Sequence, residues 1–148
     1  MAGISSLAKI RDIHDNEKQI AQKAYAQSQE TFEKIATELY NLLQKKEVAE
    51  NSFETAIQAS TSIEKIKEQS AYIEKLTNQI QTVQLLVQRA RNDMNKKQSK
   101  LSEAYIEYKK YDKIIELKKE EAQAIVRRQE ASFMDEMSMQ QYLRQKQR

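Results

Sequence analysis

Apolar residues recur at alternating steps of three and four positions through the second half of the chain, from Ile66 to Ile125. Such spacing averages 3.5 residues and keeps one seam of a helix facing a partner helix, which is typical of a left-handed coiled coil. The sequence therefore predicts a long helix that needs a second helix beside it. The seam positions are Ile66, Gln69, Ile73, Leu76, Ile80, Val83, Val87, Ala90, Met94, Lys97, Leu101, Ala104, Tyr108, Tyr111, Ile115, Lys118, Ala122 and Ile125.

The composition excludes a fold that is rich in turns. The chain has no Pro, no Cys and no Trp, and Gly3 is its one glycine. Apolar residues make up 39% and charged residues 32%, which suits a narrow apolar seam with a wide solvated surface. We therefore expect an all-α protein.

A weaker apolar row predicts the partner helix over about residues 6–57, after a serine cap at Ser5 or Ser6. Between Ile20 and Phe32 the steps lengthen to four residues each, which we interpret as a local unwinding of the supercoil. The expected row is Leu7, Ile10, Ile13, Ile20, Ala24, Ser28, Phe32, Ile35, Leu39, Leu42, Lys46, Ala49, Phe53 and Ala56.

Small polar residues at about positions 58–62 predict a turn between the two helices. Thr61 and Glu64 fit a capping box at the start of the second helix, and Ser62 is an alternative cap. The alternative to a turn is that this serine-rich stretch continues one helix. We favour the turn because the phase of the seam changes across it, and we expect the second helix over about residues 63–140.

A turn near residue 61 makes the two helices antiparallel neighbours, with paired positions that sum to about 122. Phe32 then lies opposite Ala90, so that a large residue meets a small one, as interdigitated side chains require. The start of the first helix lies opposite about residue 118 on this arithmetic, so roughly the last thirty residues have no partner within the chain. We expect residues 1–148 to form a single long antiparallel two-helix coiled-coil hairpin with an overhanging C-terminal helix end.

The sequence offers no catalytic or cofactor chemistry. His14 is the one histidine, no cysteine is present, and no Gly-rich phosphate loop occurs. We expect no enzyme, no cofactor and no metal site. No run of about 18 apolar residues predicts a membrane-spanning helix, and no secretory signal is present.

Lysines interleaved with tyrosines between residues 96 and 119 are the feature most typical of nucleic-acid binding. Tyr108 and Tyr111 fall on the seam, however, and interspersed acidic side chains dilute the charge. A solvated mixed-charge helix face is favoured, so we expect no nucleic-acid partner.

The overhang carries an apolar row that includes methionines, which adapt to several surfaces. It is either a docking segment or a fraying end, and composition leaves both interpretations open. The polar seam positions Lys46, Gln69 and Lys97 leave room for intermolecular pairing, so monomer and oligomer also stay open.

Five short motifs are spread over nearly the whole chain. They are Lys9-Ile10-Arg11-Asp12-Ile13-His14-Asp15-Asn16-Glu17-Lys18, Leu39-Tyr40, Ser62-Ile63-Glu64-Lys65-Ile66, Met94-Asn95-Lys96-Lys97-Gln98 and Met134-Asp135-Glu136. Their identity, intervals and the chain length together resemble the FliJ family of flagellar export proteins, and its Gram-positive members most.

The resemblance implies a cytoplasmic component of the flagellar type III export apparatus, peripherally associated with the inner face of the cell membrane at the flagellar base. Members are similar to the central stalk of rotary ATPases. They associate with the hexameric export ATPase (FliI), its regulator (FliH) and the cytoplasmic domain of the export gate FlhA, and have also been regarded as export chaperones. The implied function is a stalk that links the ATPase ring to the gate.

Two groups of residues are candidate contacts for these partners. Aromatic and leucine side chains that lie off the seam near the turn bury much area at modest entropic cost, although each is as readily a flank of the seam. The gate-binding candidates are Tyr40, Leu43, Tyr72, Leu85 and Leu86, and the ATPase-binding candidates at the opposite end are Ile10, Ile13, Arg127, Arg128, Phe133 and Met137.

The architecture alone leaves other functions open, because a fold does not fix function. A generic coiled-coil scaffold has the same sequence pattern. So does the equivalent stalk of a virulence type III secretion system.

Overall fold

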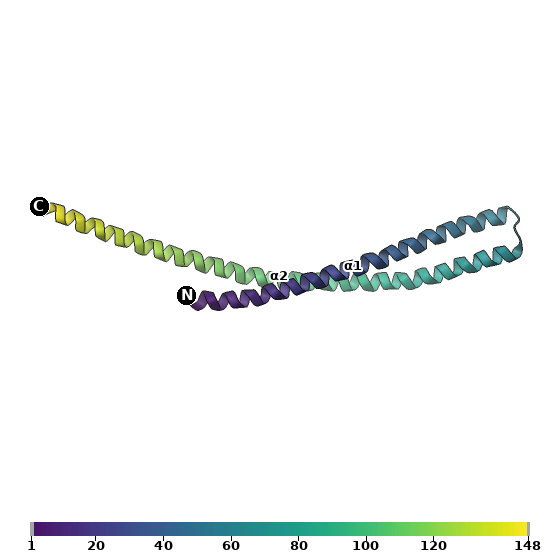
Figure 1. Cartoon of the computed structure of the whole chain (residues 1–148), viewed down its shortest axis with the longest axis horizontal. Helices are drawn as coiled ribbons and strands as arrows, with labels where there is room; N and C mark the ends of the chain where they lie inside the picture. The colour runs from purple at the N-terminus through teal and green to yellow at the C-terminus, as the bar shows by residue number, and fades with distance from the viewer. Residues whose placement is uncertain (1, 148) are drawn as a thin grey trace. The chain divides into compact units, whose positions relative to one another are not determined.

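The computed structural model describes residues 2–147, with side chains from residue 3 onward. Helix α1 spans Ala2–Gln58 and helix α2 spans Ile63–Lys146, and the described residues contain no strand. Figure 1 shows the two helices joined by one short turn. The expected all-α antiparallel hairpin is confirmed. The helix α1 begins earlier than expected, and α2 continues beyond the expected end near residue 140.

The end of α1 is closed by a Schellman motif. Ser60 adopts the left-handed conformation with φ at 57°, a position that glycine usually occupies. The N–H of Ser60 donates to the carbonyl of Ile57 at 3.3 Å, and the N–H of Thr61 donates to the carbonyl of Ala56 at 3.2 Å. These bonds satisfy carbonyls that the helix leaves unpaired, so the chain turns within a few residues.

The start of α2 is capped by Ser62, the alternative cap, instead of by Thr61. The hydroxyl of Ser62 accepts a hydrogen bond from the N–H of Lys65 at 3.4 Å. The backbone N–H of Thr61 already donates to the carbonyl of Ala56, so it is not available to the Glu64 carboxylate, and the capping box of Thr61 with Glu64 does not form.

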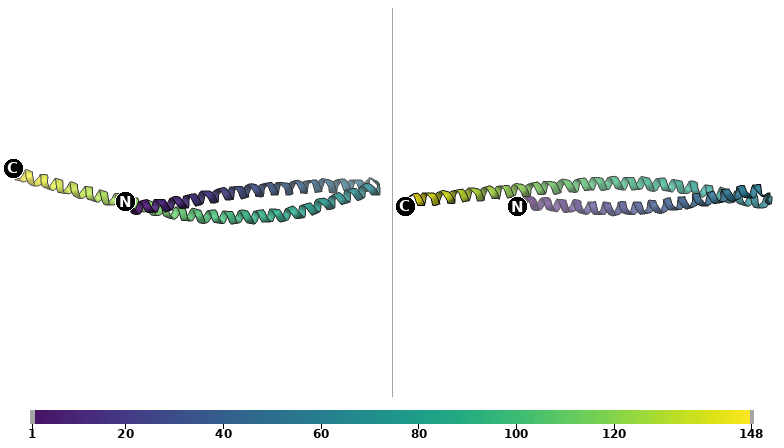
Figure 2. Two further views of the ribbon diagram at one scale, coloured as in Figure 1. Left: turned by 60° about the horizontal axis from the view of Figure 1, so that its bottom comes forward. Right: turned by 90° about the horizontal axis from the view of Figure 1, so that it is seen from above.

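The chain divides into two compact units. Unit 1 consists of residues 1–18 and 103–148, and unit 2 consists of residues 19–102. Within each unit a segment of α1 packs beside a segment of α2, which the two views of Figure 2 allow the reader to follow. Whether residues 1–148 act as the expected single domain stays a prediction.

Unit 2 has an aliphatic core on the expected seam. Leu76, Ile80 and Val83 of α2 are buried, and so is Ala56 of α1. The guanidinium carbon of Arg91 lies 5.6 Å from the centroid of the Phe32 ring. This contact is one residue from the expected pairing of Phe32 with Ala90.

The polar seam positions of unit 2 are accommodated in two ways. Lys46 and Lys97 carry their ammonium groups to acidic residues one turn away, Glu50 at 3.7 Å and Asp93 at 3.6 Å, so that their stems pack and their charges stay solvated. Gln69 is less well placed, because its buried Oε1 has no hydrogen-bond partner among the described residues.

The seam of α1 differs from the expected one over the first half of the helix. Ile10, Ile13 and Ile20 are 37%, 57% and 69% exposed, and the expected slip between Ile20 and Phe32 is wrong. The seam instead follows unbroken steps of three and four, because a continuous helix keeps the phase that its aliphatic second half sets. Its positions, all buried or half-buried, are Ile4, Leu7, Arg11, His14, Lys18, Ala21, Tyr25, Ser28, Phe32, Ile35, Leu39, Leu42, Lys46, Ala49, Phe53 and Ala56.

Candidate interaction surfaces

Unit 1 has one buried aliphatic residue, Ile115 of α2, which is 2% exposed. A further cluster of polar and aromatic side chains joins the two helices within this unit. We call this cluster the polar zipper. It consists of Arg11, His14 and Lys18 from α1 and of Tyr108, Tyr111 and Asp112 from α2.

The contacts of the polar zipper are specific in geometry. The His14 ring stacks on the Tyr111 ring, with centroids 5.0 Å apart and planes 10° apart. The Lys18 ammonium lies 4.1 Å from the centroid of the Tyr108 ring, a cation–π contact.

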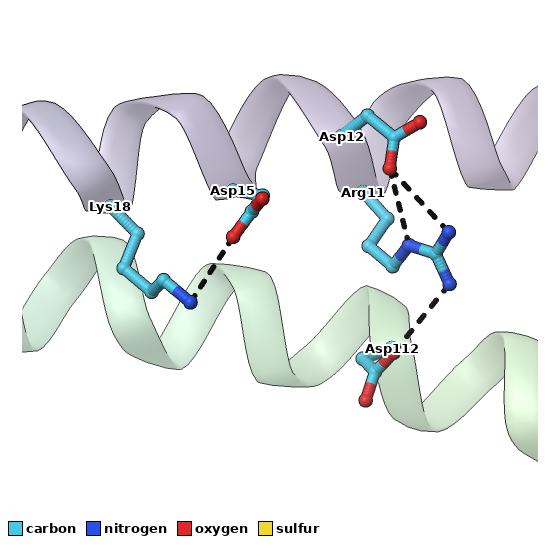
Figure 3. A network of polar contacts seen from close by, with 5 residues as sticks. All are labelled: Arg11, Asp12, Asp15, Lys18 and Asp112. Atoms are coloured by element: carbon cyan, nitrogen blue, oxygen red, sulfur yellow. Dashed lines mark hydrogen bonds and ion pairs between the residues drawn. The ribbon is translucent and has the colours of Figure 1, made fainter.

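Ion pairs complete the zipper, as Figure 3 shows. Arg11 Nη1 lies 3.7 Å from the Oδ1 atom of Asp112 across the helix pair, and Lys18 Nζ lies 3.1 Å from Asp15 Oδ1 on its own helix. These groups keep partial access to water, so each ion pair contributes little stability by itself. In addition to the buried Ile115, the polar zipper therefore supplies contacts that are each worth less than a buried aliphatic side chain.

The observed contacts of the polar zipper lie up to one helical turn away from the pairing expected from positions that sum to about 122. His14 is expected opposite residue 108 and stacks on Tyr111, while Lys18 is expected opposite residue 104 and contacts Tyr108. Side chains lean toward the N-terminus of their own helix. In an antiparallel pair the tips therefore meet partners further along than the Cα positions suggest. The same lean applies to any long side chain on such an interface.

The polar zipper also argues against the nucleic-acid interpretation. The rings of Tyr108 and Tyr111 are occupied by Lys18 and His14 from α1. They are thus not available to stack on bases, whereas Tyr105 of the same stretch is 47% exposed. The absence of a nucleic-acid partner therefore stays a prediction.

All five gate-binding candidates are exposed, and all belong to unit 2. The exposed fraction of the side chain is 60% for Tyr40 and 49% for Tyr72, and Leu85 at 58% exceeds Leu43 and Leu86. Exposure alone is compatible with a docking role, since an anchor must be accessible before binding.

The gate-binding candidates do not form one continuous patch. In an antiparallel helix pair, the residues directly before a seam position on either helix lie along one side of the pair. The residues directly after a seam position lie along the other side. Tyr72 and Leu86 directly precede seam positions and share the first side. Tyr40 and Leu43 fall on the second side, and Leu85 lies on the back of α2.

Sequence reasoning missed a hollow beside Tyr72. Val48 is 65% exposed, lies on the same side as Tyr72, and lines this hollow with it. Val48 comes directly before the seam position Ala49 and is itself off the seam, so no periodic signal marked it. The other lining residues are Asn41, Gln44, Lys45, Glu47, Ala49, Ser52 and Gln69.

The ATPase-binding candidates all belong to unit 1 and are exposed. Ile10 is only 37% exposed, because it lies directly beside the seam. Near them a shallow hollow is lined by Gly3 and Ile4 of α1 and by Glu121 and Ile125 of α2, which marks where α1 begins beside α2. Every described residue from 125 to 147 is exposed, so the expected overhang begins at about residue 125 instead of 119.

No group of acidic or histidine side chains within the described residues is arranged to hold a metal ion. None of the described helices combines the length and the apolar character of a membrane span. The surfaces that remain are exposed apolar and aromatic patches on a long helix pair. Together with the fold, they define a two-helix coiled-coil protein with accessible apolar surface.

The chain matches the family described as flagellar FliJ protein over residues 4–147. It is also 32% identical over 135 residues to the flagellar FliJ protein of Bacillus subtilis (strain 168), which covers 91% of this chain and 92% of that relative. No solved structure matches the chain significantly. The chain thus belongs to the FliJ family and is a component of flagellar protein export.

Proposed function

We propose that this chain is a non-enzymatic, stalk-like coiled coil that associates with the flagellar export ATPase ring and links it to the export gate. The observation that carries the proposal is the exposed end of α2, where a helical segment of more than 20 residues carries several apolar side chains and buries none of them among the described residues. A helix of this kind is stabilised when a partner covers its apolar side chains. Membership in the FliJ family favours flagellar partners over those of a virulence secretion system.

The proposed partners are the export ATPase FliI with its regulator FliH, the cytoplasmic domain of the export gate FlhA, and export chaperones. Ile10, Ile13, Phe133 and Met137 offer apolar contact in unit 1, and Arg127 and Arg128 offer charge. The protein then works in the cytoplasm, peripherally associated with the inner face of the cell membrane at the flagellar base.

The ATPase contact is tested by removing the tail, which we define as residues 119–148. We expect the truncated chain to lose stimulation of ATP hydrolysis by the cognate export ATPase, because the candidate anchors Phe133 and Met137 are gone. The far-ultraviolet circular dichroism of the remaining hairpin and its unfolding midpoint serve as the folding control. Full stimulation by a truncated chain that is folded contradicts the proposed contact.

The gate contact is tested one side at a time, because the candidates lie on two sides of unit 2. One variant carries Tyr40→Ala and Leu43→Ala, and the other carries Tyr72→Ala and Leu86→Ala. We expect at least one of them to weaken binding to the cytoplasmic domain of FlhA by about tenfold or more, as the loss of aromatic anchors does.

A matched control for the gate experiment is Ile106→Ala, which removes a 62% exposed side chain from α2 in unit 1. It should leave the affinity for the gate domain unchanged. If both double variants bind as tightly as this control, neither side of unit 2 is the gate-binding surface.

A further inference from the structure

The tail of α2 carries a second apolar row that is separate from the hairpin seam. Continuing the seam beyond Ile125 reaches the polar positions Gln129, Ser132 and Glu136. About a third of a turn away, steps of four and three residues give a better row. Its two central positions are apolar and are flanked on each side by a polar one, and its positions are Val126, Glu130, Phe133, Met137, Gln140 and Arg144.

The second row is fully accessible. Within the row, Phe133 is 61%, Val126 48% and Met137 44% exposed. Met134, which lies directly beside the row, is 64% exposed. Glu130 makes no ion pair with any described residue. A row with 3–4 spacing on one helix is half of a coiled-coil interface. A row whose apolar centre is flanked by polar residues on both sides can pair with an antiparallel copy of itself.

We propose that this row pairs with the same row of a second copy of the chain, forming an antiparallel interface between the two tails. The twofold axis passes near residue 135. Phe133 then lies opposite Met137 of the second copy, and Met134 lies beside Met134 of the second copy. Phenylalanine and methionine make favourable sulfur–aromatic contacts, and the interface closes on itself as a dimer.

The charges select the antiparallel direction. The pairing sets Glu130 opposite Gln140 of the second copy, and the lean of side chains carries its carboxylate toward Arg144, as Lys18 is carried to Tyr108 in the hairpin. Two ion pairs result. A parallel dimer instead sets Glu130 against Glu130 and Arg144 against Arg144.

The charges also select the position of the axis. Sliding one tail along the other by a full heptad, which moves the axis by half a heptad, places Glu130 opposite Phe133 and buries a carboxylate against an aromatic ring. The proposed position avoids this. It leaves Glu136 of both copies on one flank, and this like-charge contact keeps the association reversible.

Cross-linking tests the geometry, because the chain contains no cysteine. Two full-length variants, Met134→Cys and Val126→Cys, are treated separately with a short bis-maleimide and run on a denaturing gel. We expect a covalent dimer from Met134→Cys. We expect none from Val126→Cys, whose two copies lie about 27 Å apart along antiparallel helices. Cross-linking of both variants indicates parallel tails, and cross-linking of neither indicates no tail pairing; both results overturn the proposal.

Sedimentation equilibrium of the full chain tests the side chains. Phe133→Glu should weaken the dimer at least tenfold, whereas the control Met139→Glu, which places the same charge on another face of the same exposed helix, should not. Glu130→Arg should weaken the dimer, and Glu130→Arg combined with Arg144→Glu should restore it. A wild-type chain that stays monomeric at hundreds of micromolar, or equal effects of Phe133→Glu and Met139→Glu, contradicts the proposal.

The dimer does not depend on the proposed function, but the two share side chains. Phe133 and Met137 are buried in the dimer, so a partner that needs them must compete with the second copy. If the wild-type chain is monomeric and still stimulates the export ATPase, the dimer alone is refuted. A dimer without any effect on the ATPase refutes the stalk alone.

Discussion

At the scale of residues, two tyrosines on the same helix differ in their surroundings: Tyr111 packs against α1, and Tyr105 lies at the surface. The ring of Tyr111 stacks on His14, whereas Tyr105 is 47% exposed and has Lys109 nearby on its own helix. We expect Tyr111→Ala to lower the free energy of unfolding by about 2 kcal/mol, because a packed aromatic side chain is lost. Tyr105→Ala should change it by less than about 0.5 kcal/mol. Urea unfolding followed by circular dichroism measures both, and equal losses contradict the zipper.

At the scale of elements, the seam of α2 was predictable and the first half of the α1 seam was not. The aliphatic run through Leu76, Ile80 and Val83 leaves one face for the partner helix, so apolar spacing finds it. In the first half of α1, Ile10, Ile13 and Ile20 are exposed, and the seam holds polar residues such as Arg11 and His14. Apolar spacing fails there because the phase is inherited from residues further along the helix. Counting back from Phe32 in unbroken 3–4 steps finds the true seam. The exposure of the ATPase-binding candidates Ile10 and Ile13 depends on that phase, so it also required the structure.

The phase of α1 yields a prediction about two aliphatic residues one and a half turns apart. Leu7 lies on the observed seam and Ile13 is 57% exposed. We expect Leu7→Glu to destabilise the chain by about 2 kcal/mol, because it places a carboxylate at a packed position. Ile13→Glu should cost less than about 0.5 kcal/mol and is therefore a folded variant for testing the ATPase contact. Thermal unfolding measures both. A larger loss from Ile13→Glu would restore the seam expected from the isoleucines.

At the scale of the whole molecule, the two units differ in what their seams contain, and local stability should differ with them. Unit 2 has several buried aliphatic residues such as Ile80, while unit 1 has the single buried Ile115 and otherwise relies on half-exposed seam residues, the polar zipper among them. Segments with few buried apolar contacts open at lower free energy than the global unfolding. We expect amide protons of residues 4–18 to exchange at least about tenfold faster than those of residues 32–56, which corresponds to about 1.4 kcal/mol.

Fraying of the chain terminus alone would also speed exchange in residues 4–18, and residues 103–118 distinguish the two causes. These residues lie inside α2, far from either end of that helix, and pack in unit 1. If the polar zipper opens as a unit, they exchange as fast as residues 4–18, and Tyr111→Ala accelerates both segments together. Hydrogen exchange followed by mass spectrometry resolves these segments. Slow exchange in residues 103–118 beside fast exchange in residues 4–18 would mean that only the end of α1 frays and that the helix pair opens as one cooperative structure.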